Sequence, residues 1–174
     1  MTKFRDGLIG PTLILFTICF VITLALAQVY VITKPIIDEG ERVASNEARM
    51  EVLPEGKGFA EITGAALPEG VSEAYKADNG AGYVFTSEAK GFGGPVVYMI
   101  GIDNGGNVVG LKMFSHDETP GLGTKVGDMG YLQNYYGSVD VDVVDAVTGA
   151  TRTTESLKNS LKQAYAAFEL VKEV

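Results

Sequence analysis

Residues 82–114 have the sequence GYVFTSEAKGFGGPVVYMIGIDNGGNVVGLKMF, and this stretch determines the architecture of the chain. It contains three runs rich in Val, Ile, Tyr and Phe, over residues 82–88, 96–103 and 107–114. Such residues favour β-strands, and the Asn-Gly-Gly turn at 104–106 is typical of a hairpin. The stretch therefore predicts three consecutive strands of an antiparallel sheet.

The segments on either side extend this pattern. Residues 73–77 precede an Asp-Asn-Gly turn at 78–80, which predicts another hairpin strand before residue 82. Apolar residues three and four positions apart predict an amphipathic helix over residues 155–174, on Leu157, Leu161, Ala164, Phe168 and Val171. A further strand is expected over 139–144, and a loop with a short helix over 115–137. Together these elements predict an α+β fold, an antiparallel sheet with packed helices.

The N-terminal part is of a different kind, because no charged residue occurs between Gly7 and Thr33. Residues 8–33 are long enough to cross a membrane as one helix, for which about 20 apolar residues suffice. A cleaved signal peptide is the alternative, with Ala-Leu-Ala at 25–27 as the cleavage site, but the apolar run is longer than such peptides have. We therefore expect a retained anchor, followed by a helix over residues 36–53 that continues from the anchor across a kink at Lys34-Pro35.

The flanking charges give the anchor a direction. Lys3 and Arg5 precede it, and cytoplasmic flanks of membrane helices are enriched in such residues. We therefore expect a single-pass protein of the cell (inner) membrane with its N-terminus in the cytoplasm. The expected divisions are a cytoplasmic N-terminus (1–7), a transmembrane helix (8–33), a helical linker and loop (34–70) and an extracytoplasmic domain (71–174).

The composition excludes some functions. The chain carries 22 acidic and 14 basic residues and a net charge of −8, which does not suit nucleic acid, whose phosphates need Lys and Arg. Its single cysteine, Cys19, lies within the predicted anchor, so no internal disulfide is possible. We expect no nucleic-acid partner, and we expect Cys19 to be a packing residue.

Two glycine-rich loops lie next to the predicted strands. The turn GFGGP at 91–95 either is only a tight turn or leaves room for another group to approach the backbone. In the loop SHDETPGLGTK at 115–125, Pro120-Gly121 suits a type II turn, and the two glycines leave the amides around Leu122 open to a flat polar ring. Lys125 is placed to hold negative charge at one edge of such a ring.

The same loop holds His116, the only histidine of the chain. Three ligands within His116-Asp117-Glu118 do not converge easily on one metal ion, and no second His or nearby Cys is present, so no metal site is expected. No obvious Ser or Cys nucleophile accompanies the histidine, so it is assigned no catalytic role. A structural role for it stays open.

The segment VDAVTGATRTTES at 144–156 has more hydroxyl groups than a helix start needs. It contains the pattern Asp-x-x-Thr-Gly-Ala-Thr at 145–151. A helix N-terminus offers unpaired N–H groups and the positive end of its dipole to a phosphate. Redundant capping by Thr151, Thr153 or Thr154 is the alternative, and spacing alone does not decide between the two.

Taken in this order, the single anchor, GFGGP at 91–95, HDETPGLGTK at 116–125 and DAVTGAT at 145–151 resemble the FMN-binding domain family. Within it the chain is similar to the G subunits of Rnf electron-transport complexes, which are related to the C subunits of the sodium-pumping NADH:quinone reductases. In this family a flavin transferase joins FMN, through its phosphate, to the last hydroxyl residue of the third motif. The resemblance therefore implies a covalent phosphothreonyl linkage of FMN to Thr151, in an attachment motif of Asp145, Thr148, Gly149, Ala150 and Thr151.

The resemblance also implies further cofactor-binding residues. Five would lie against the isoalloxazine, namely Glu118, Thr119, Gly121, Leu122 and Gly123, and the others are Lys125, Thr148, Gly149 and Ala150. It implies an electron-carrying flavoprotein subunit of an ion-translocating ferredoxin:NAD oxidoreductase, with no independent catalysis. The implied partners are the other integral and peripheral Rnf subunits, the flavin transferase and the membrane. Two alternatives stay open: the C subunit of the sodium-translocating NADH:quinone reductase, and a membrane-anchored binding module without a redox role.

Overall fold

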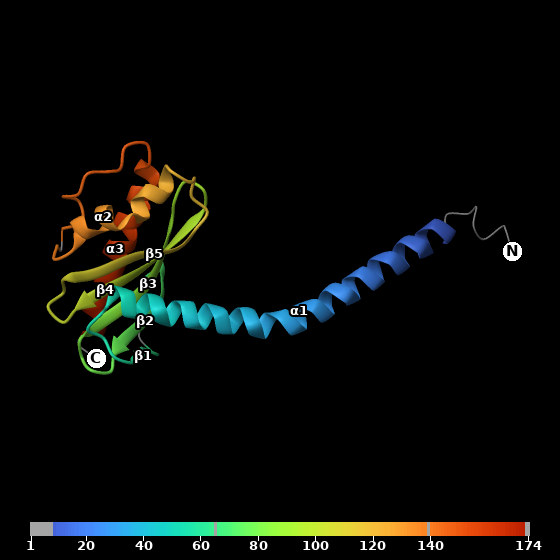
Figure 1. The fold of residues 1–174 in the computed structure, drawn as a ribbon, viewed down its shortest axis with the longest axis horizontal. Coiled ribbons are helices and arrows are strands. Elements are labelled where there is room, and N and C mark those ends of the chain that lie inside the picture. The colour runs from blue at the N-terminus through green and yellow to red at the C-terminus, as the bar shows by residue number, and fades with distance from the viewer. Residues whose placement is uncertain (1–8, 65, 139, 173–174) are drawn as a thin grey trace. The chain divides into compact units, whose positions relative to one another are not determined.

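The structure, a computed structural model, describes residues 9–64, 66–138 and 140–172 (Figure 1). The chain divides into two compact units, one that ends at Ser45 and one that begins at Asn46. Helix α1 (Ile9–Val52) forms the described part of the first unit and also supplies the first residues of the second.

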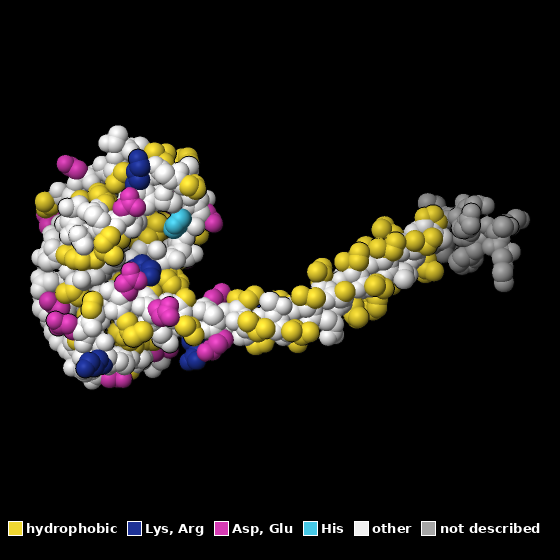
Figure 2. Space-filling view, viewed as in Figure 1, with side chains coloured by type: hydrophobic (Ala, Val, Ile, Leu, Met, Phe, Trp, Pro, Cys, Tyr) yellow, Lys and Arg dark blue, Asp and Glu magenta, His cyan; other side chains and the backbone are white. Residues whose placement is uncertain are grey.

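In the first unit, α1 carries apolar side chains on its outside. Large apolar residues from Leu13 to Ile37 are exposed, and Figure 2 shows them in yellow along the helix. Among the described residues, α1 is one helix that is long and apolar enough, by length and composition, to cross a membrane, with a mean hydropathy of 2.4 over an 18-residue window. The helix expected over 36–53 continues from the anchor as predicted, because α1 runs through Pro35 to Val52.

The second unit is built on a five-stranded antiparallel sheet in the order β1-β2-β3-β4-β5 (Figure 1). Its strands are β1 (Phe59–Glu61), β2 (Val71–Ala77), β3 (Gly82–Lys90), β4 (Pro95–Asp103) and β5 (Val108–His116). The turns after β2 and β4 use Gly80 and Gly106 at φ of 70° and 84°, where a side chain would be strained. The hairpins predicted at 78–80 and 104–106 are confirmed, and so is the α+β fold class.

Helix α3 (Thr151–Val171) covers one face of this sheet. Its Leu157 and Leu161 are completely buried and belong to one apolar cluster with Phe85 and Tyr98 of the sheet. Burial of each of these leucines stabilises the fold by about 1.5–3 kcal/mol. The contact anchors the helix firmly, and it thereby fixes the position of the first turn of α3.

The last turn of α1 covers the opposite face. Val52 is buried there in a second apolar cluster with Val84 and Met99. Gly101 and Gly110, which pair across β4 and β5, make this approach possible, because a Cβ on either would lie 2.1 or 2.2 Å from the Val52 carbonyl oxygen. The sheet is therefore packed on both faces, and the compact unit that contains it begins at Asn46.

The connection from β5 to α3 contains three short helical turns, η1 (Gly123–Gly127), α2 (Met129–Leu132) and η2 (Gln133–Tyr135). The strand predicted over 139–144 is wrong for its described residues, none of which belongs to a strand, while Val139 lies outside the described residues. The edge of β5 is already used, because the Gly137 N–H donates to the Val108 carbonyl and the Tyr136 hydroxyl accepts from the Leu111 N–H. The alternating valines therefore have no strand partner.

Candidate functional site

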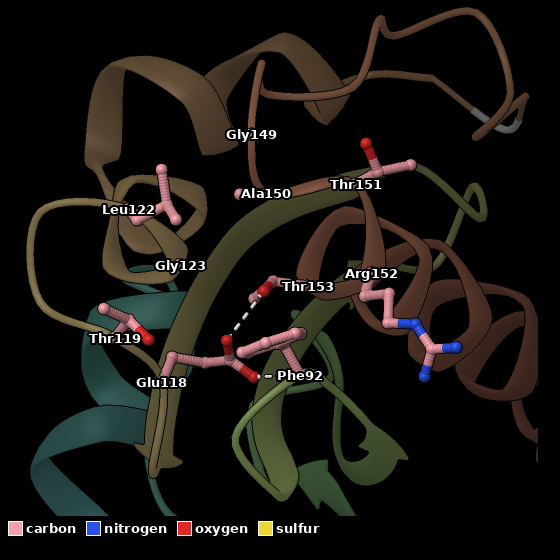
Figure 3. Close-up of a pocket in the computed structure, with 10 residues that line it drawn as sticks. All are labelled: Phe92, Glu118, Thr119, Leu122, Gly123, Gly149, Ala150, Thr151, Arg152 and Thr153. Carbon is pink, nitrogen blue, oxygen red and sulfur yellow. Dashed lines mark hydrogen bonds between the residues drawn. The ribbon is translucent and has the colours of Figure 1, made fainter.

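A cavity of about 290 Å³ lies where the glycine turn after β3, the loop after β5 and the first turn of α3 meet (Figure 3). Ten residues line it: Phe92, Glu118, Thr119, Leu122, Gly123, Gly149, Ala150, Thr151, Arg152 and Thr153. The three motifs that were far apart in the sequence thus share one site.

Glu118 ties the three segments together. Its side chain is buried, with 5% exposed. Its Oε1 accepts hydrogen bonds from the backbone N–H groups of Phe92 and Gly93, at 2.7 and 3.2 Å, and its Oε2 accepts one from Thr153 Oγ1 at 2.8 Å. A buried carboxylate needs such donors, because it is otherwise strongly destabilised away from water. Glu118 therefore joins the three segments of the site by hydrogen bonds.

The glycines around Glu118 leave room for these hydrogen bonds. A Cβ on Gly91 would lie 2.1 Å from Glu118 Oε1, and a Cβ on Gly123 would lie 2.5 Å from Oε2. A Cβ on Gly93 would lie 2.0 Å from the Asp117 carbonyl oxygen. The GFGGP turn thus leaves room for another group, as one of its two interpretations required, and that group is the chain's own loop after β5.

Helix α3 begins at Thr151, four residues earlier than predicted. The residue before it, Ala150, has no side chain that can cap the helix, and no side-chain cap hydrogen bond is formed. Gly149 has φ of 81°, a conformation that favours glycine, and a Cβ there would lie 3.0 Å from Leu122 Cδ1. The turn therefore brings the start of α3 close against the Leu122 loop and leaves its first N–H groups uncapped.

The hydroxyl groups of this turn differ in their surroundings. Thr151 is exposed, and in the described part of the chain its hydroxyl has no hydrogen-bond partner. Thr153 and Thr154 are buried, and their hydroxyls donate to Glu118 Oε2 and to the Ala150 carbonyl. Capping by Thr151 is thereby wrong. The Thr154 hydroxyl also accepts from the Val147 N–H at 3.2 Å, so it stabilises the turn before the helix.

The surface around Thr151 combines apolar and positive groups. Phe92 and Leu122 leave 72% and 43% of their surfaces exposed on the rim of the cavity. Arg152 is exposed beside them and has no ion pair within the described residues. Because the N-terminus of α3 also carries partial positive charge, this rim suits a ligand with a flat apolar part and an anionic group.

The amides around Leu122 are not open, contrary to expectation. The N–H groups of Leu122 and Gly123 both donate to the Thr119 carbonyl, at 3.2 and 3.0 Å. The Gly121 N–H donates to Thr124 Oγ1 at 2.9 Å. The loop satisfies its own donors, so a ring against it would meet mainly the Leu122 side chain.

Four of the residues predicted at the site do not line the cavity: Asp145, Thr148, Gly121 and Lys125. Asp145 and Thr148 are exposed on the segment that leads into α3, and the Asp145 carbonyl accepts a hydrogen bond from the Tyr131 hydroxyl at 2.8 Å. Gly121 and Lys125 are exposed on the loop beyond Leu122. Contact of Thr148, Gly121 and Lys125 with a cofactor stays a prediction, as does the place of Asp145 in the attachment motif.

His116 ends β5 at the entrance to the loop. Its Nδ1 accepts a hydrogen bond from the Glu118 N–H at 3.3 Å, which gives the histidine a structural role in the turn. Among the described residues, no three His, Cys, Asp or Glu side chains are grouped so that they could hold a metal ion.

Sequence reasoning missed three residues of the cavity: Phe92, Arg152 and Thr153 as a partner of Glu118. Phe92 lies within the quoted glycine turn, and a large aromatic residue at a turn tip is an available signal for an exposed contact. Arg152 directly follows the predicted attachment residue. The bond between Thr153 and Glu118 joins residues 35 positions apart and has no local signal.

Comparisons with known proteins show which family the segment around the cavity matches. Residues 91–166 match the FMN-binding domain family, and this segment contains every residue that lines the cavity. The chain is 24% identical to the G subunit of the proton-translocating ferredoxin:NAD(+) oxidoreductase complex of Clostridium ljungdahlii, over 93% of this chain and 92% of that protein. It is 28% identical to the G subunit of the Na(+)-translocating ferredoxin:NAD(+) oxidoreductase complex of Acetobacterium woodii, over 90% and 89% of the two chains.

A relative that matches a shorter part of the chain and a solved structure were also found. The G subunit of the ion-translocating oxidoreductase complex of Methanosarcina acetivorans is 27% identical over 68% of this chain and 71% of that protein. The crystal structure of NqrC from Shewanella oneidensis aligns with a TM-score of 0.49 and 22% identity, over 66% of this chain and 73% of that one.

The cavity therefore lies within the segment that matches the FMN-binding domain family. More particularly, the chain resembles the G subunits of ion-translocating oxidoreductase complexes over most of its length, and those relatives are subunits of an oxidoreductase.

Proposed function

We propose that this chain is a membrane-anchored flavoprotein subunit that carries FMN covalently on Thr151 and transfers electrons within an Rnf-type ion-translocating ferredoxin:NAD oxidoreductase complex. The observation that carries the proposal is the exposed, unbonded hydroxyl of Thr151 on the first residue of α3, at the rim of the cavity. The relatives named as G subunits of such complexes support the complex, and the matched domain supports FMN.

The residues present fit such a group. An isoalloxazine is flat and largely apolar, and Phe92 and Leu122 offer exposed apolar surface on the rim. A phosphodiester on Thr151 would keep one negative charge, which the N-terminus of α3 and the exposed Arg152 stabilise. Thr119, Gly149 and Ala150 would complete the wall. When bound, FMN supplies the ability to accept and release one or two electrons.

The attachment itself is proposed to be a phosphoryl transfer by a flavin transferase. The bond from Thr151 Oγ to phosphorus forms, and the phosphoanhydride bond of a flavin dinucleotide donor breaks. A nucleoside monophosphate leaves, the hydroxyl proton is released, and no electron moves. Asp145 and Thr148 are exposed outside the cavity, so we assign them to recognition by the transferase. Lys125 and Gly121 would meet the flavin only beyond the cavity wall.

The apolar helix determines the proposed location of the domain relative to the membrane. We propose that residues 8–33 form the membrane anchor, that residues 1–7 face the cytoplasm and that the FMN-binding domain lies outside it. The exposed apolar side chains of α1 support the anchor, and the basic residues Lys3 and Arg5 support its orientation. A covalent bond has a clear use there, because a flavin lost outside the cytoplasm has no pool to replace it. Other Rnf subunits would be the electron donor and acceptor.

The decisive experiment expresses the full chain together with its cognate flavin transferase. Fluorescence of the chain in a denaturing gel reports covalent flavin. Thr151→Ser keeps the hydroxyl and is expected to stay fluorescent, whereas Thr151→Ala is expected to fold but to lose all fluorescence. Undiminished fluorescence of Thr151→Ala would refute the assigned attachment residue. A wild-type chain that stays dark would leave a membrane-anchored binding module without a redox role.

A further inference from the structure

The attachment segment holds four threonines within seven residues, but only two of them are exposed to an attaching enzyme. Thr148 and Thr151 are exposed, while Thr153 and Thr154 are each 1% exposed. Thr153 and Thr151 are two positions apart on α3, which places them about 200° apart around the helix axis. Whatever holds Thr153 inward therefore also turns Thr151 outward.

Glu118 is the group that holds Thr153 inward. Its Oε2 accepts a hydrogen bond from Thr153 Oγ1 at 2.8 Å, and its Oε1 accepts hydrogen bonds from the Phe92 and Gly93 N–H groups. No Lys or Arg of the described chain forms an ion pair with it. Figure 3 shows Glu118 directed between Phe92 and Thr153, with the Thr151 hydroxyl directed away from it. The carboxylate is thus already occupied by its own chain.

The sheet also stabilises the first turn of α3 by hydrogen bonds. The Tyr98 hydroxyl donates to the Thr153 carbonyl at 3.3 Å and bonds with Ser156 Oγ at 3.0 Å. Burial raises the pKa of the Tyr98 phenol above its usual range, so the group stays protonated and able to donate. These contacts hold the backbone of α3, whereas the Glu118 bond is the one that joins the helix to the loop after β5.

We infer that Glu118 and Thr153 form a positioning pair, which fixes the first turn of α3 so that, of the three threonines of that turn, only Thr151 presents its hydroxyl to the flavin transferase. The inference rests on the proposed function. It gives Glu118 a role other than the contact with the isoalloxazine that the family resemblance implied. It also assigns a supporting role to Gly91 and Gly123, because the absence of a Cβ on each leaves room for the Glu118 carboxylate.

The test is the rate of flavin incorporation into the full chain by the transferase, with peptide mapping of the modified residue. Thr153→Val keeps the shape of the side chain and removes its hydroxyl, and we expect about tenfold slower incorporation at Thr151, as the loss of one hydrogen bond to a charged group implies. Thr153→Ser restores the hydroxyl and is expected to restore the wild-type rate. Melting temperatures check that each variant folds, and Thr153→Ala replaces Thr153→Val if that variant does not.

Ser156→Ala is the matched control. It removes another buried hydroxyl from the same helix, one that bonds Tyr98 and the Thr153 carbonyl but not Glu118. We expect it to lower the melting temperature without slowing incorporation. A wild-type rate for Thr153→Val, or an equal slowing by Ser156→Ala, would overturn the positioning pair. Failure of the wild-type chain to take up flavin would instead overturn the proposed function, so the two failures are distinguishable.

Discussion

Gly91 is the residue whose substitution tests the construction of the site most sharply. In Gly91→Ala the new Cβ would lie 2.1 Å from Glu118 Oε1 and 2.7 Å from Val96 Cγ2. The buried carboxylate must then move and lose its bonds to the Phe92 and Gly93 N–H groups. Each hydrogen bond to a charged group contributes about 1.5–3 kcal/mol, and a partial loss of both gives a destabilisation of about 3 kcal/mol.

Such a loss lowers the melting temperature of a domain of this size by about 10 °C. Thermal unfolding of the full chain in detergent, followed by the near-ultraviolet circular dichroism of its tyrosines, measures this change. Gly130→Ala is the matched control, because a Cβ there meets no atom within 4 Å. If Gly91→Ala melts at the same temperature as Gly130→Ala, the role of the GFGGP turn in accommodating Glu118 is refuted.

Three further predictions concern other parts of the chain. Arg49→Lys is expected to destabilise the fold by about 1–2 kcal/mol in chemical denaturation, because a lysine cannot both stack on the Tyr75 ring, 3.7 Å from the guanidinium carbon, and bond Asn46. Burial raises the pKa of Asp103, but hydrogen bonds from Asn107 outweigh this effect and hold the pKa below its usual value. Asp103→Asn is therefore expected to lower the free energy of unfolding at pH 7 by less than about 1 kcal/mol, and this difference closes as the pH falls through the lowered pKa, where the carboxylate of the wild type is protonated. Chemical denaturation of both chains at pH 7 and at acidic pH checks this. An alkaline phosphatase reporter fused to the C-terminus is expected to be active in whole cells, and an inactive, stably produced fusion would contradict the proposed orientation.

The sheet was predictable because its determinants are local. Turns with Asn and Gly, such as those at 78–80 and 104–106, favour hairpins whatever surrounds them, provided that a strand-forming run lies on each side of the turn. The same holds for the apolar face of α3, whose spacing of three and four residues is visible in the sequence. Local pattern failed over 140–144, because the edge of β5 had already been taken by Tyr136 and Gly137.

The site was predictable only in part. The three motifs do meet in one cavity, but the contacts that join them are long-range, such as Glu118 with Phe92 and with Thr153. No local pattern indicates which of two adjacent carboxylates, Asp117 or Glu118, is buried. The packing of Val52 against paired glycines is equally invisible from sequence, because a glycine in a strand does not identify the backbone that will approach it.

The central claim concerns the oxygen of one side chain, and intact mass with fragment mapping of the native chain tests it most directly. The chain is purified from its own cells, where the transferase is present. The account predicts one added flavin mononucleotide group, joined through a phosphodiester and confined to the fragment that contains Thr151. A native chain of unmodified mass, or a flavin mapped to Thr148 or to any other residue, would contradict it.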